Sequence, residues 1–352
     1  MEEKKILTPS DADNILEIRN LVKYFPIKSS FFKRTIGNVK AVDGVSFNIK
    51  RRQTMGLVGE SGCGKSTCGR TILRLLEKTG GDVIFDGQDV FALSKEELRK
   101  LRPRMQLVFQ DPYSSLSPRL PVGEIIGEAA REHKIVPPDE FDAYISRVMD
   151  VCGLPSYYKE RYPHEFSGGQ RQRICIARAL ALSPDFIVCD EPVSALDVSI
   201  QAQIINLLKQ LQQEFGLTYL FISHDLSVVE HISDTVGVMY LGSMVEYAET
   251  EKIFAKPLNP YTKALFSAIP IPDPDVKLNR IILKGSIPSP SNPPKGCKFN
   301  TRCEQCKEIC KYAAPEWKEV EEGHFCACHL YNDAAADSRA QEAMEKMKRE
   351  GA

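Results

Sequence analysis

The feature that most constrains the fold of this chain is a glycine-rich run that directly follows a short apolar stretch. Residues 55–58 are apolar, residues 59–67 read GESGCGKST, and a helical pattern covers residues 67–76. A GxxxxGK[ST] run between a strand and a helix cradles phosphate, because glycine lets backbone N–H groups approach it and the helix N-terminus attracts anions. The alternative, a glycine-rich turn that binds no ligand, would not require a strand before it and a helix after it. We therefore expect a phosphate-binding loop (the P-loop) formed by Gly59, Glu60, Ser61, Gly62, Cys63, Gly64, Lys65, Ser66 and Thr67.

Two of these residues and one further strand indicate nucleotide chemistry. Lys65 supplies a point charge for the β and γ phosphates, and the Ser66 hydroxyl can coordinate Mg²⁺. Residues 186–191 read FIVCDE, an apolar strand that ends in Asp190 and Glu191. Buried carboxylates need a cation or a solvated cleft. An acidic strand end alone is often only a turn, but beside a P-loop it predicts Asp190 as a Mg²⁺ ligand, direct or through water, and Glu191 as the base for attacking water.

A second glycine-rich helix start follows the same logic. Ser167, Gly168, Gly169 and Gln170 precede a strong helical pattern, with Ser167 as a natural N-cap. The element could be a plain capped loop, but its positive end is also a potential phosphate site. One P-loop already satisfies one triphosphate. The surplus site therefore predicts ATP shared between two copies of the domain.

The order of strands and helices predicts an α/β domain. Short β-branched runs at 14–19, 55–58, 107–109, 186–189, 218–222 and 235–240 alternate with helical patterns, as in parallel strands with crossover helices. We place this domain at 14–255, with a helical subdomain at about 111–166. Residues 256–294 are rich in proline, and we expect them to form an extended connector with little regular structure. A C-terminal extension then runs over 256–331, and residues 332–352 form a flexible or frayed tail.

Composition narrows the class of partner. The net charge is -1, with 43% hydrophobic and 26% charged residues, which argues against a protein held by nucleic-acid phosphates or by a polybasic membrane face. The N-terminus is polar, and no apolar run approaches the 18 residues that a spanning helix needs. We therefore expect an intracellular chain that does not itself cross a bilayer.

Six of the eleven cysteines lie between Cys297 and Cys328. Without a secretion signal, disulfides explain this cluster poorly and a metal site explains it better. The spacing is C-x5-C-x2-C-x3-C followed, fifteen residues on, by C-x-C-H. Three interpretations stay open: an iron–sulfur cluster, a zinc site at Cys303, Cys306, Cys326 and Cys328, or free thiols.

The ordered motifs resemble one family. The P-loop, Gln110, Ser167–Gln170, Asp190-Glu191, SALD at 194–197 and His224 are similar to the nucleotide-binding subunit of an ABC (ATP-binding cassette) transporter over about residues 14–250. The resemblance implies a P-loop NTPase cassette, with a mixed or parallel sheet core and with antiparallel β and helical subdomains. It also implies a head-to-tail dimer that encloses two ATP molecules.

The resemblance assigns further roles. Gln110 senses the γ-phosphate and Mg²⁺, Asp197 couples the two sites, and His224 contacts the γ-phosphate. Phe25 stacks on adenine, with Tyr24 as the alternative. Phe166 stands where the family usually has Leu, and we expect little effect from this change.

The remaining segments resemble one branch of that family. Residues 259–265 (NPYTKAL), 285–290 (GSIPSP), 296–303 (GCKFNTRC), 111–119 (DPYSSLSPR) and the insert at 28–40 are similar to oligopeptide and dipeptide importer ATPases, a branch shared with nickel importers. Its small, irregular C-terminal extension implies a [4Fe–4S] cluster on Cys297, Cys303, Cys310 and Cys328. Cys306 and Cys326 would then be spare.

These observations predict an ATP-hydrolysing motor at the cytoplasmic face of the membrane, peripheral to it. Its partners would be a second ABC ATPase (a paralogue or a second copy), two permease subunits and, indirectly, an extracytoplasmic peptide-binding protein. ATP and Mg²⁺ would be its cofactors, and nucleic acid would not be a partner. The alternatives are an import ATPase for nickel or another small solute and a soluble ABC ATPase. The latter class has coiled-coil insertions or two cassettes in one chain, and this sequence has neither.

Overall fold

A computed structural model describes residues 13–29, 35–269, 280–332 and 334–350. The chain divides into two compact units. Unit 1 is made of Met1–Glu17, Asn48–Thr54 and Val83–Ser223, and unit 2 of Ile18–Phe47, Met55–Asp82 and His224–Ala352.

A parallel sheet forms the core of unit 1. Its strands, in spatial order, are β6 (Met105–Val108), β7 (Phe186–Asp190) and β8 (Thr218–Ile222). Every residue of β7 and β8 is buried, as expected for parallel strands that are covered on both faces. The register pairs Asp190 with Ile222 at the carboxyl ends of β7 and β8. The acidic strand end is therefore held at one edge of this sheet.

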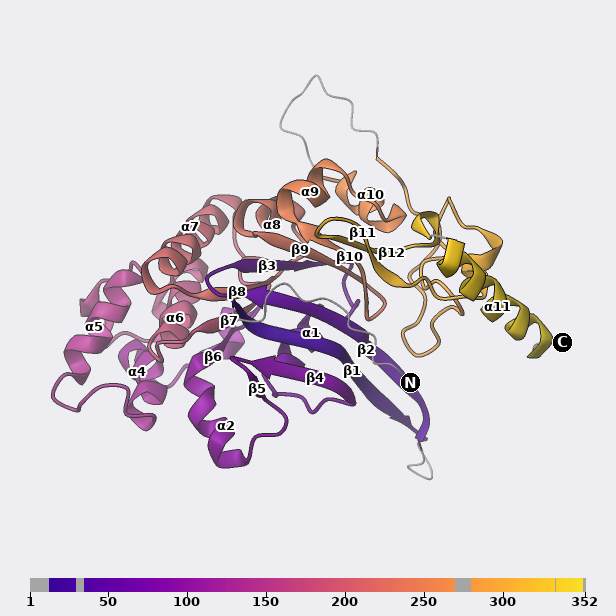
Figure 1. The fold of residues 1–352 in the computed structure, drawn as a ribbon. Coiled ribbons are helices and arrows are strands. Elements are labelled where there is room, and N and C mark those ends of the chain that lie inside the picture. Colours follow the sequence, from indigo (N-terminus) through magenta and orange to yellow (C-terminus); the bar gives the residue numbers. More distant parts are fainter. Residues whose placement is uncertain (1–12, 30–34, 270–279, 333, 351–352) are drawn as a thin grey trace, which may run out of the picture. The chain divides into compact units, whose positions relative to one another are not determined.

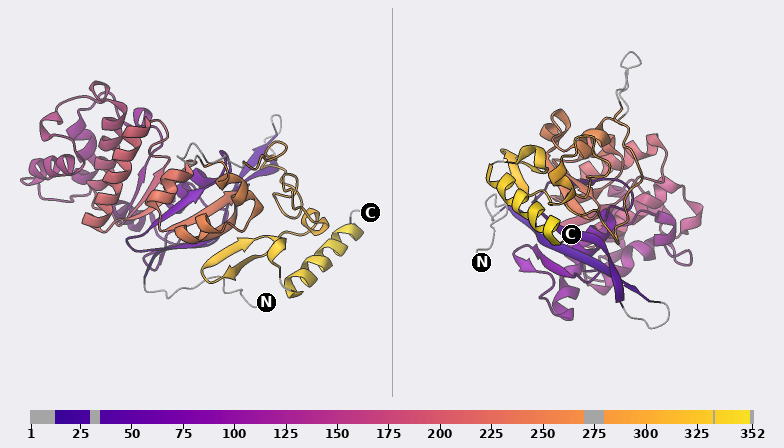
Figure 2. Two further views of the ribbon diagram at one scale, coloured as in Figure 1. Left: turned by 90° about the horizontal axis from the view of Figure 1, so that it is seen from above. Right: turned by 90° about the vertical axis from the view of Figure 1, so that its right-hand side faces the viewer.

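Helices make up most of the rest of unit 1, and those in magenta gather together in Figures 1 and 2. They are α2 (Lys95–Leu101), η1 (Arg102–Arg104), α3 (Pro112–Ser115), α4 (Val122–Glu132), α5 (Phe141–Val151), η2 (Ser156–Tyr158), η3 (Pro163–Glu165), α6 (Gly168–Leu180) and α7 (Val198–Phe215). Helix α7 ends at Gly216, whose φ of 66° is the left-handed conformation that suits glycine at a helix C-terminus.

Unit 2 has a mixed sheet in the order β3, β9, β10, β12, β11. Its strands are β3 (Thr54–Val58), β9 (Thr235–Tyr240), β10 (Ser243–Glu249), β11 (Trp317–Glu321) and β12 (His324–Ala327). The β3–β9 pair is parallel and the other neighbours are antiparallel. Leu241 and Gly242, with φ of 42° and 80°, form the tight turn between β9 and β10.

The C-terminal extension is built onto this sheet. Its hairpin β11–β12 pairs with β10, so that Tyr247 faces Phe325 (Figure 1). The sequence pattern did not predict this hairpin. The helices of unit 2 are α1 (Lys65–Ile72), α8 (Leu226–Ile232), α9 (Thr250–Ala255), α10 (Pro260–Phe266), η4 (Glu308–Lys311), η5 (His329–Tyr331) and α11 (Ala334–Glu350). Figure 2 shows α11 in yellow as a single straight helix at the C-terminal end.

Three further strands have residues in both units: β1 (Asn14–Lys28), β2 (Thr35–Lys50) and β4 (Gly80–Phe85). In unit 1, the end of β4 pairs antiparallel with β5 (Gln88–Asp89). The expected α/β class, with parallel and antiparallel strands together, is therefore confirmed.

The structure differs from the expected extended connector at one place. Residues 260–266 form α10, because the Asn259 side chain accepts the Tyr261 N–H at 2.9 Å and Pro260 suits the first helical position. Residues 270–279 of that connector, residues 30–34 of the insert and the polar residues 1–12 lie outside the described residues. No helix in the described part of the chain is both long and apolar enough to cross a bilayer.

Candidate functional site

The P-loop of unit 2 has a backbone path that only glycine allows at two positions. Gly59 has a φ of 148° and Gly64 a φ of 107°. A Cβ at Gly59 would lie 2.2 Å from the Met239 carbonyl oxygen, and one at Gly64 would lie 2.0 Å from the Ala41 carbonyl oxygen. Since real Cβ atoms do not approach backbone this closely, these two glycines are required for the loop to form. Helix α1 begins directly after Gly64.

Lys65 lies inside this loop. It is 5% exposed, and its Nζ donates to the carbonyl oxygens of Gly59 at 2.7 Å and Glu60 at 3.2 Å. Its ammonium group is thus held over the loop by backbone oxygens. Ser66 and Thr67 follow in the first turn of α1 and are half-buried.

Glu60 is anchored by residues that sequence reasoning did not single out. Its carboxylate accepts a hydrogen bond from each terminal nitrogen of Arg302, at 2.6 and 2.9 Å. Its backbone N–H donates to the Tyr261 hydroxyl at 2.9 Å. Both partners belong to the C-terminal extension. The available signal was the basic residue directly before Cys303 in GCKFNTRC.

The two aromatic candidates for adenine differ in their surroundings. Phe25 is 36% exposed, with Lys23 Nζ 4.7 Å from its ring centroid. The Tyr24 hydroxyl donates to Asp43, and burial together with this neighbour raises the pKa of Tyr24 to about 12. Burial opposes ionisation of Asp43, but hydrogen bonds from Lys298 and Tyr24 outweigh it and lower the pKa of Asp43. Phe25 is therefore the more accessible ring.

In unit 1, Gln110 and Glu191 lie together. Gln110 follows β6 and donates from Nε2 to Glu191 Oε2 at 2.8 Å. Asp190, the last residue of β7, is 1% exposed. Glu191 has a φ of 49°, a left-handed conformation that costs a non-glycine residue about 1–2 kcal/mol. Such strain clusters at functional sites.

The expected helix start at Ser167 is present in unit 1. Ser167 Oγ accepts the Gln170 N–H at 3.4 Å, and Gln170 Oε1 accepts the Ser167 N–H at 3.0 Å, which makes a capping box on α6. A Cβ on Gly169 would lie 2.5 Å from Ile200 Cγ2, so α6 and α7 approach closely there. Asp197 is the exposed residue before α7.

The sequence also singled out Phe166 and His224. Phe166 is 5% exposed, and its ring packs edge-on against Tyr158 at 5.3 Å. The Phe166 side chain is therefore packed inside unit 1. His224 belongs to unit 2, where it is exposed just before the α8 N-cap Asp225.

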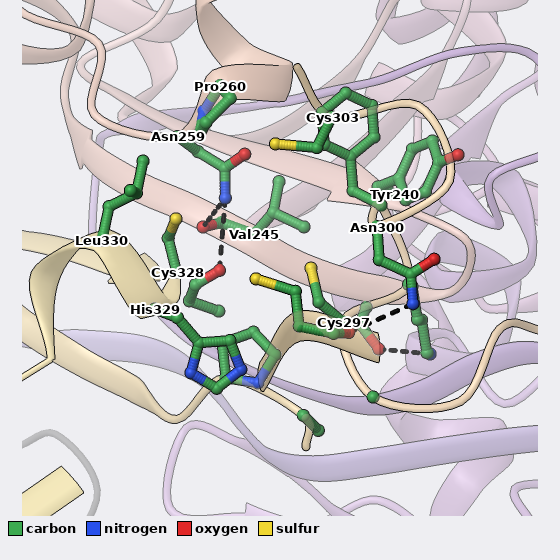
Figure 3. A pocket seen from close by; sticks show the side chains of 18 of the residues that line it. Tyr240, Val245, Asn259, Pro260, Cys297, Asn300, Cys303, Cys328, His329 and Leu330 are labelled. Carbon is green, nitrogen blue, oxygen red and sulfur yellow. Dashed lines mark hydrogen bonds between the residues drawn. The ribbon is translucent and has the colours of Figure 1, made fainter. Parts of the chain in front are cut away.

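A cavity of about 210 Å³ lies within unit 2, between the C-terminal extension and residues of β2, β9 and β10. Its lining includes Cys297, Cys303, Cys310 and Cys328, the four positions implied for a cluster. Cys297, Cys303 and Cys328 are among the lining side chains drawn in Figure 3. Burial, reinforced by the neighbouring cysteines, raises the pKa of Cys297 to about 12 and that of Cys328 to about 11. A cation would be needed to hold them as thiolates at neutral pH.

The alternative zinc set is not assembled around this cavity. Of its members, Cys303 and Cys328 line the cavity, whereas Cys306 and Cys326 do not. Cys326 is instead buried beside Asn259 Nδ2, at 4.0 Å. Among the described residues, no three His, Cys, Asp or Glu side chains lie close enough together to bind a single metal ion. The iron–sulfur cluster is not confirmed by this geometry and stays a prediction.

Comparison with known proteins decides the family. The profile "ABC transporter" matches residues 42–194, and the profile "Oligopeptide/dipeptide transporter, C-terminal region" matches residues 245–310. The chain is 56% identical over 329 residues to the oligopeptide transport ATP-binding protein AppF of Bacillus subtilis, across 93% of this chain and 100% of AppF. The chain belongs to the ABC transporter family. It is an ATP-binding subunit of that family, and ABC ATP-binding proteins are ATPases.

Solved ABC structures confirm the fold of the cassette. A CbiO1 structure from Clostridium perfringens, part of an ABC transporter complex, has a TM-score of 0.60 and 29% identity, covering 69% of this chain and 92% of that one. A dimeric structure of the ATP-binding cassette MJ0796 with ADP and Pi has a TM-score of 0.59 and 28% identity, covering 67% and 98%.

Proposed function

We propose that this ABC subunit hydrolyses ATP to drive the import of oligopeptides or dipeptides. The observation that carries the proposal is the match of residues 245–310 to the oligopeptide/dipeptide C-terminal region, together with the full-length similarity to an oligopeptide transport protein. The extension is the part of the chain that separates this branch from cassettes in general.

In unit 2, we assign ATP contacts to the P-loop and to Phe25. Backbone N–H groups of residues 59–67 would bind phosphate, Lys65 would neutralise the β and γ phosphates, and Ser66 would contribute a hydroxyl ligand to Mg²⁺. The exposure of Phe25 supports it as the adenine-stacking ring, since Tyr24 is hydrogen-bonded to Asp43. His224 is assigned to the γ-phosphate.

In unit 1, we assign the chemical step to Glu191. As a carboxylate it would accept a proton from the water that attacks the γ-phosphorus, and ADP and phosphate would leave. Gln110 and Asp190 carry oxygen ligands of the type that Mg²⁺ prefers, and the ion would offset charge on the phosphates. The Gln110–Glu191 hydrogen bond, at 2.8 Å, supports a shared role.

The helix start at Ser167–Gln170 would complete the ATP site of a second subunit, and Asp197 would lie in the loop between the two sites. The dimeric form of the MJ0796 cassette supports a head-to-tail pair. We propose a paralogue or a second copy as the partner, with two permease subunits, at the cytoplasmic face of the membrane.

Co-purification from membranes tests this function. We expect the tagged chain to recover two permease subunits and an ABC ATPase, and its deletion to abolish uptake of labelled di- or oligopeptides. Loss of nickel uptake with peptide uptake intact would support the nickel alternative. Recovery of ribosomes or DNA-repair factors in place of permeases would contradict transport.

We further propose that Cys297, Cys303, Cys310 and Cys328 hold a [4Fe–4S] cluster. The fit rests on four thiols that line one cavity in unit 2, which is the donor set of such clusters. Bound there, the cluster would cross-link four points of a segment that is poor in apolar residues, a structural role.

Anaerobic purification tests the cluster. We expect brown protein with about four iron atoms per chain, and colourless, iron-free protein when Cys303 and Cys310 are both replaced by Ser. The double variant Cys306→Ser, Cys326→Ser is the control and should keep its colour and iron. A colourless wild type with one zinc per chain would contradict the cluster.

A further inference from the structure

The loop from Cys297 to Cys303 faces two regions of unit 2. Residues 297–300 and Cys303 line the cysteine cavity, while the Lys298 ammonium contacts Asp43 of β2 and the Arg302 guanidinium contacts Glu60 of the P-loop. The loop is a compact turn, because the Asn300 N–H donates to the Cys297 carbonyl at 3.0 Å and the Cys303 N–H to the Phe299 carbonyl at 3.1 Å. A change at either cysteine is therefore transmitted along a short, hydrogen-bonded segment.

Arg302 makes the strongest of these contacts. Its side chain is 7% exposed, and both terminal nitrogens donate to the Glu60 carboxylate, at 2.6 and 2.9 Å. Nη1 also lies 3.4 Å from the Tyr240 hydroxyl. A bidentate, charge-assisted pair fixes orientation as well as distance. With Arg302 at 7% and Glu60 at 23% exposure, the pair is better shielded from water than the exposed ion pairs of the chain, which contribute little.

The partner of Arg302 is part of the P-loop itself. The Glu60 carbonyl oxygen accepts a hydrogen bond from Lys65 Nζ at 3.2 Å. The Glu60 backbone N–H donates to the Tyr261 hydroxyl at 2.9 Å. Arg302 thus holds the residue that contacts the phosphate-binding lysine. It also neutralises a carboxylate that would otherwise repel phosphate beside the loop.

Lys298 contacts β2 and the turn between β9 and β10. Its Nζ donates to Asp43 Oδ2 at 2.8 Å, to the Leu241 carbonyl at 2.9 Å and to Ser243 Oγ at 2.6 Å. Asp43 in turn accepts the hydroxyl of Tyr24, the neighbour of Phe25. One loop therefore contacts both the P-loop and the strand pair that carries the aromatic candidates.

We propose that Arg302 is a positioning residue for ATP binding: it fixes the P-loop through Glu60, so that the affinity for ATP depends on how Cys297 and Cys303 hold their loop. This rests on the proposed function only in taking ATP as the ligand of the P-loop.

The first test compares Arg302 with Arg339, an arginine of α11. Arg302→Met is expected to raise the Kd for ATP about tenfold. Arg339→Met is the matched control, because Arg339 makes an equally bidentate pair with Glu316, at 2.8 and 2.8 Å, away from the P-loop. It should leave the Kd unchanged. Equilibrium binding of ATP to the full-length chain is the readout. An unchanged Kd in Arg302→Met overturns the proposal.

A double-mutant cycle separates positioning from a general loss of structure. If Arg302 acts through Glu60, the variant with both Arg302→Met and Glu60→Gln should bind ATP no more weakly than Arg302→Met alone. Additive losses overturn the proposal.

Arg302→Lys keeps the charge but not the bidentate fork, so we expect an intermediate Kd, with kcat at saturating ATP and the melting temperature retained. This variant keeps the test decisive if Arg302→Met does not fold.

The second test addresses the cysteines. Replacing Cys297 and Cys303 by Ser should raise the Kd for ATP as Arg302→Met does, with no further rise when the changes are combined. An unchanged Kd in the serine variant overturns the dependence on the cysteines. Lys65→Ala separates the two proposals, because unaltered ATP binding in that variant would contradict the P-loop assignment itself.

Discussion

Replacing Glu191 by Gln is expected to lower ATP turnover at least about 100-fold while ATP binding is retained. Gln has nearly the same shape but cannot accept the proton of the attacking water. Its side-chain oxygen can still accept the Gln110 N–H that Glu191 Oε2 receives at 2.8 Å. The backbone hydrogen bonds around residue 191, to Ile222 and Ser194, do not involve the side chain and should persist. The change therefore removes the ability to accept a proton and keeps these hydrogen bonds.

Single-turnover hydrolysis and equilibrium ATP binding measure the two effects separately. Glu96→Gln is the control, because Glu96 is an exposed carboxylate of unit 1 that pairs with Lys100 in its own helix. It should hydrolyse ATP at the wild-type rate. With ATP and Mg²⁺, Glu191→Gln should also accumulate as an ATP-bound dimer by light scattering. Turnover near the wild-type rate would show that another group is the base.

Local sequence was sufficient to predict the parts of the site that depend on neighbouring residues. The P-loop follows from its glycines, since Gly59 and Gly64 occupy positions with no room for a Cβ. The cap at Ser167 follows from the residue type at a helix start. Gln110 and Glu191 lie at the ends of neighbouring parallel strands, β6 and β7, and their contact is a consequence of that order.

Contacts between distant positions had no comparable signal. Arg302 and Glu60 are 242 positions apart, and neither has a periodic pattern that would link them. Burial of the arginine depends on how the extension packs, which composition does not reveal. The hairpin β11–β12 was missed for a related reason. Its strands are short, and no residue of β11 is fully buried, so that the alternation of apolar residues is weak.

The second large effect is expected at Glu246, a fully buried carboxylate on β10. Its oxygens accept the Leu258 N–H at 2.7 Å and the Asn259 N–H at 2.8 Å, and His324 Nε2 lies 2.8 Å from Oε1. Glu246 thereby joins β10 to the segment before α10 and to β12. Glu246→Ala would leave three buried donors without an acceptor. We expect the free energy of unfolding of the extension to fall by about 3–5 kcal/mol.

Urea denaturation with limited proteolysis measures this loss. Cleavage in the extension should occur at lower urea in Glu246→Ala, and Glu246→Gln, which keeps one acceptor oxygen, should be intermediate. Glu321→Ala is the control, since the exposed pair of Glu321 with Lys256 also joins the hairpin to the preceding segment. It should leave the midpoint unchanged. Because Asn259 begins the helix that carries Tyr261, and Tyr261 holds Glu60, Glu246→Ala should weaken ATP binding at the urea concentration where the extension opens. Intact ATP affinity in an opened extension would contradict the link between the extension and the P-loop.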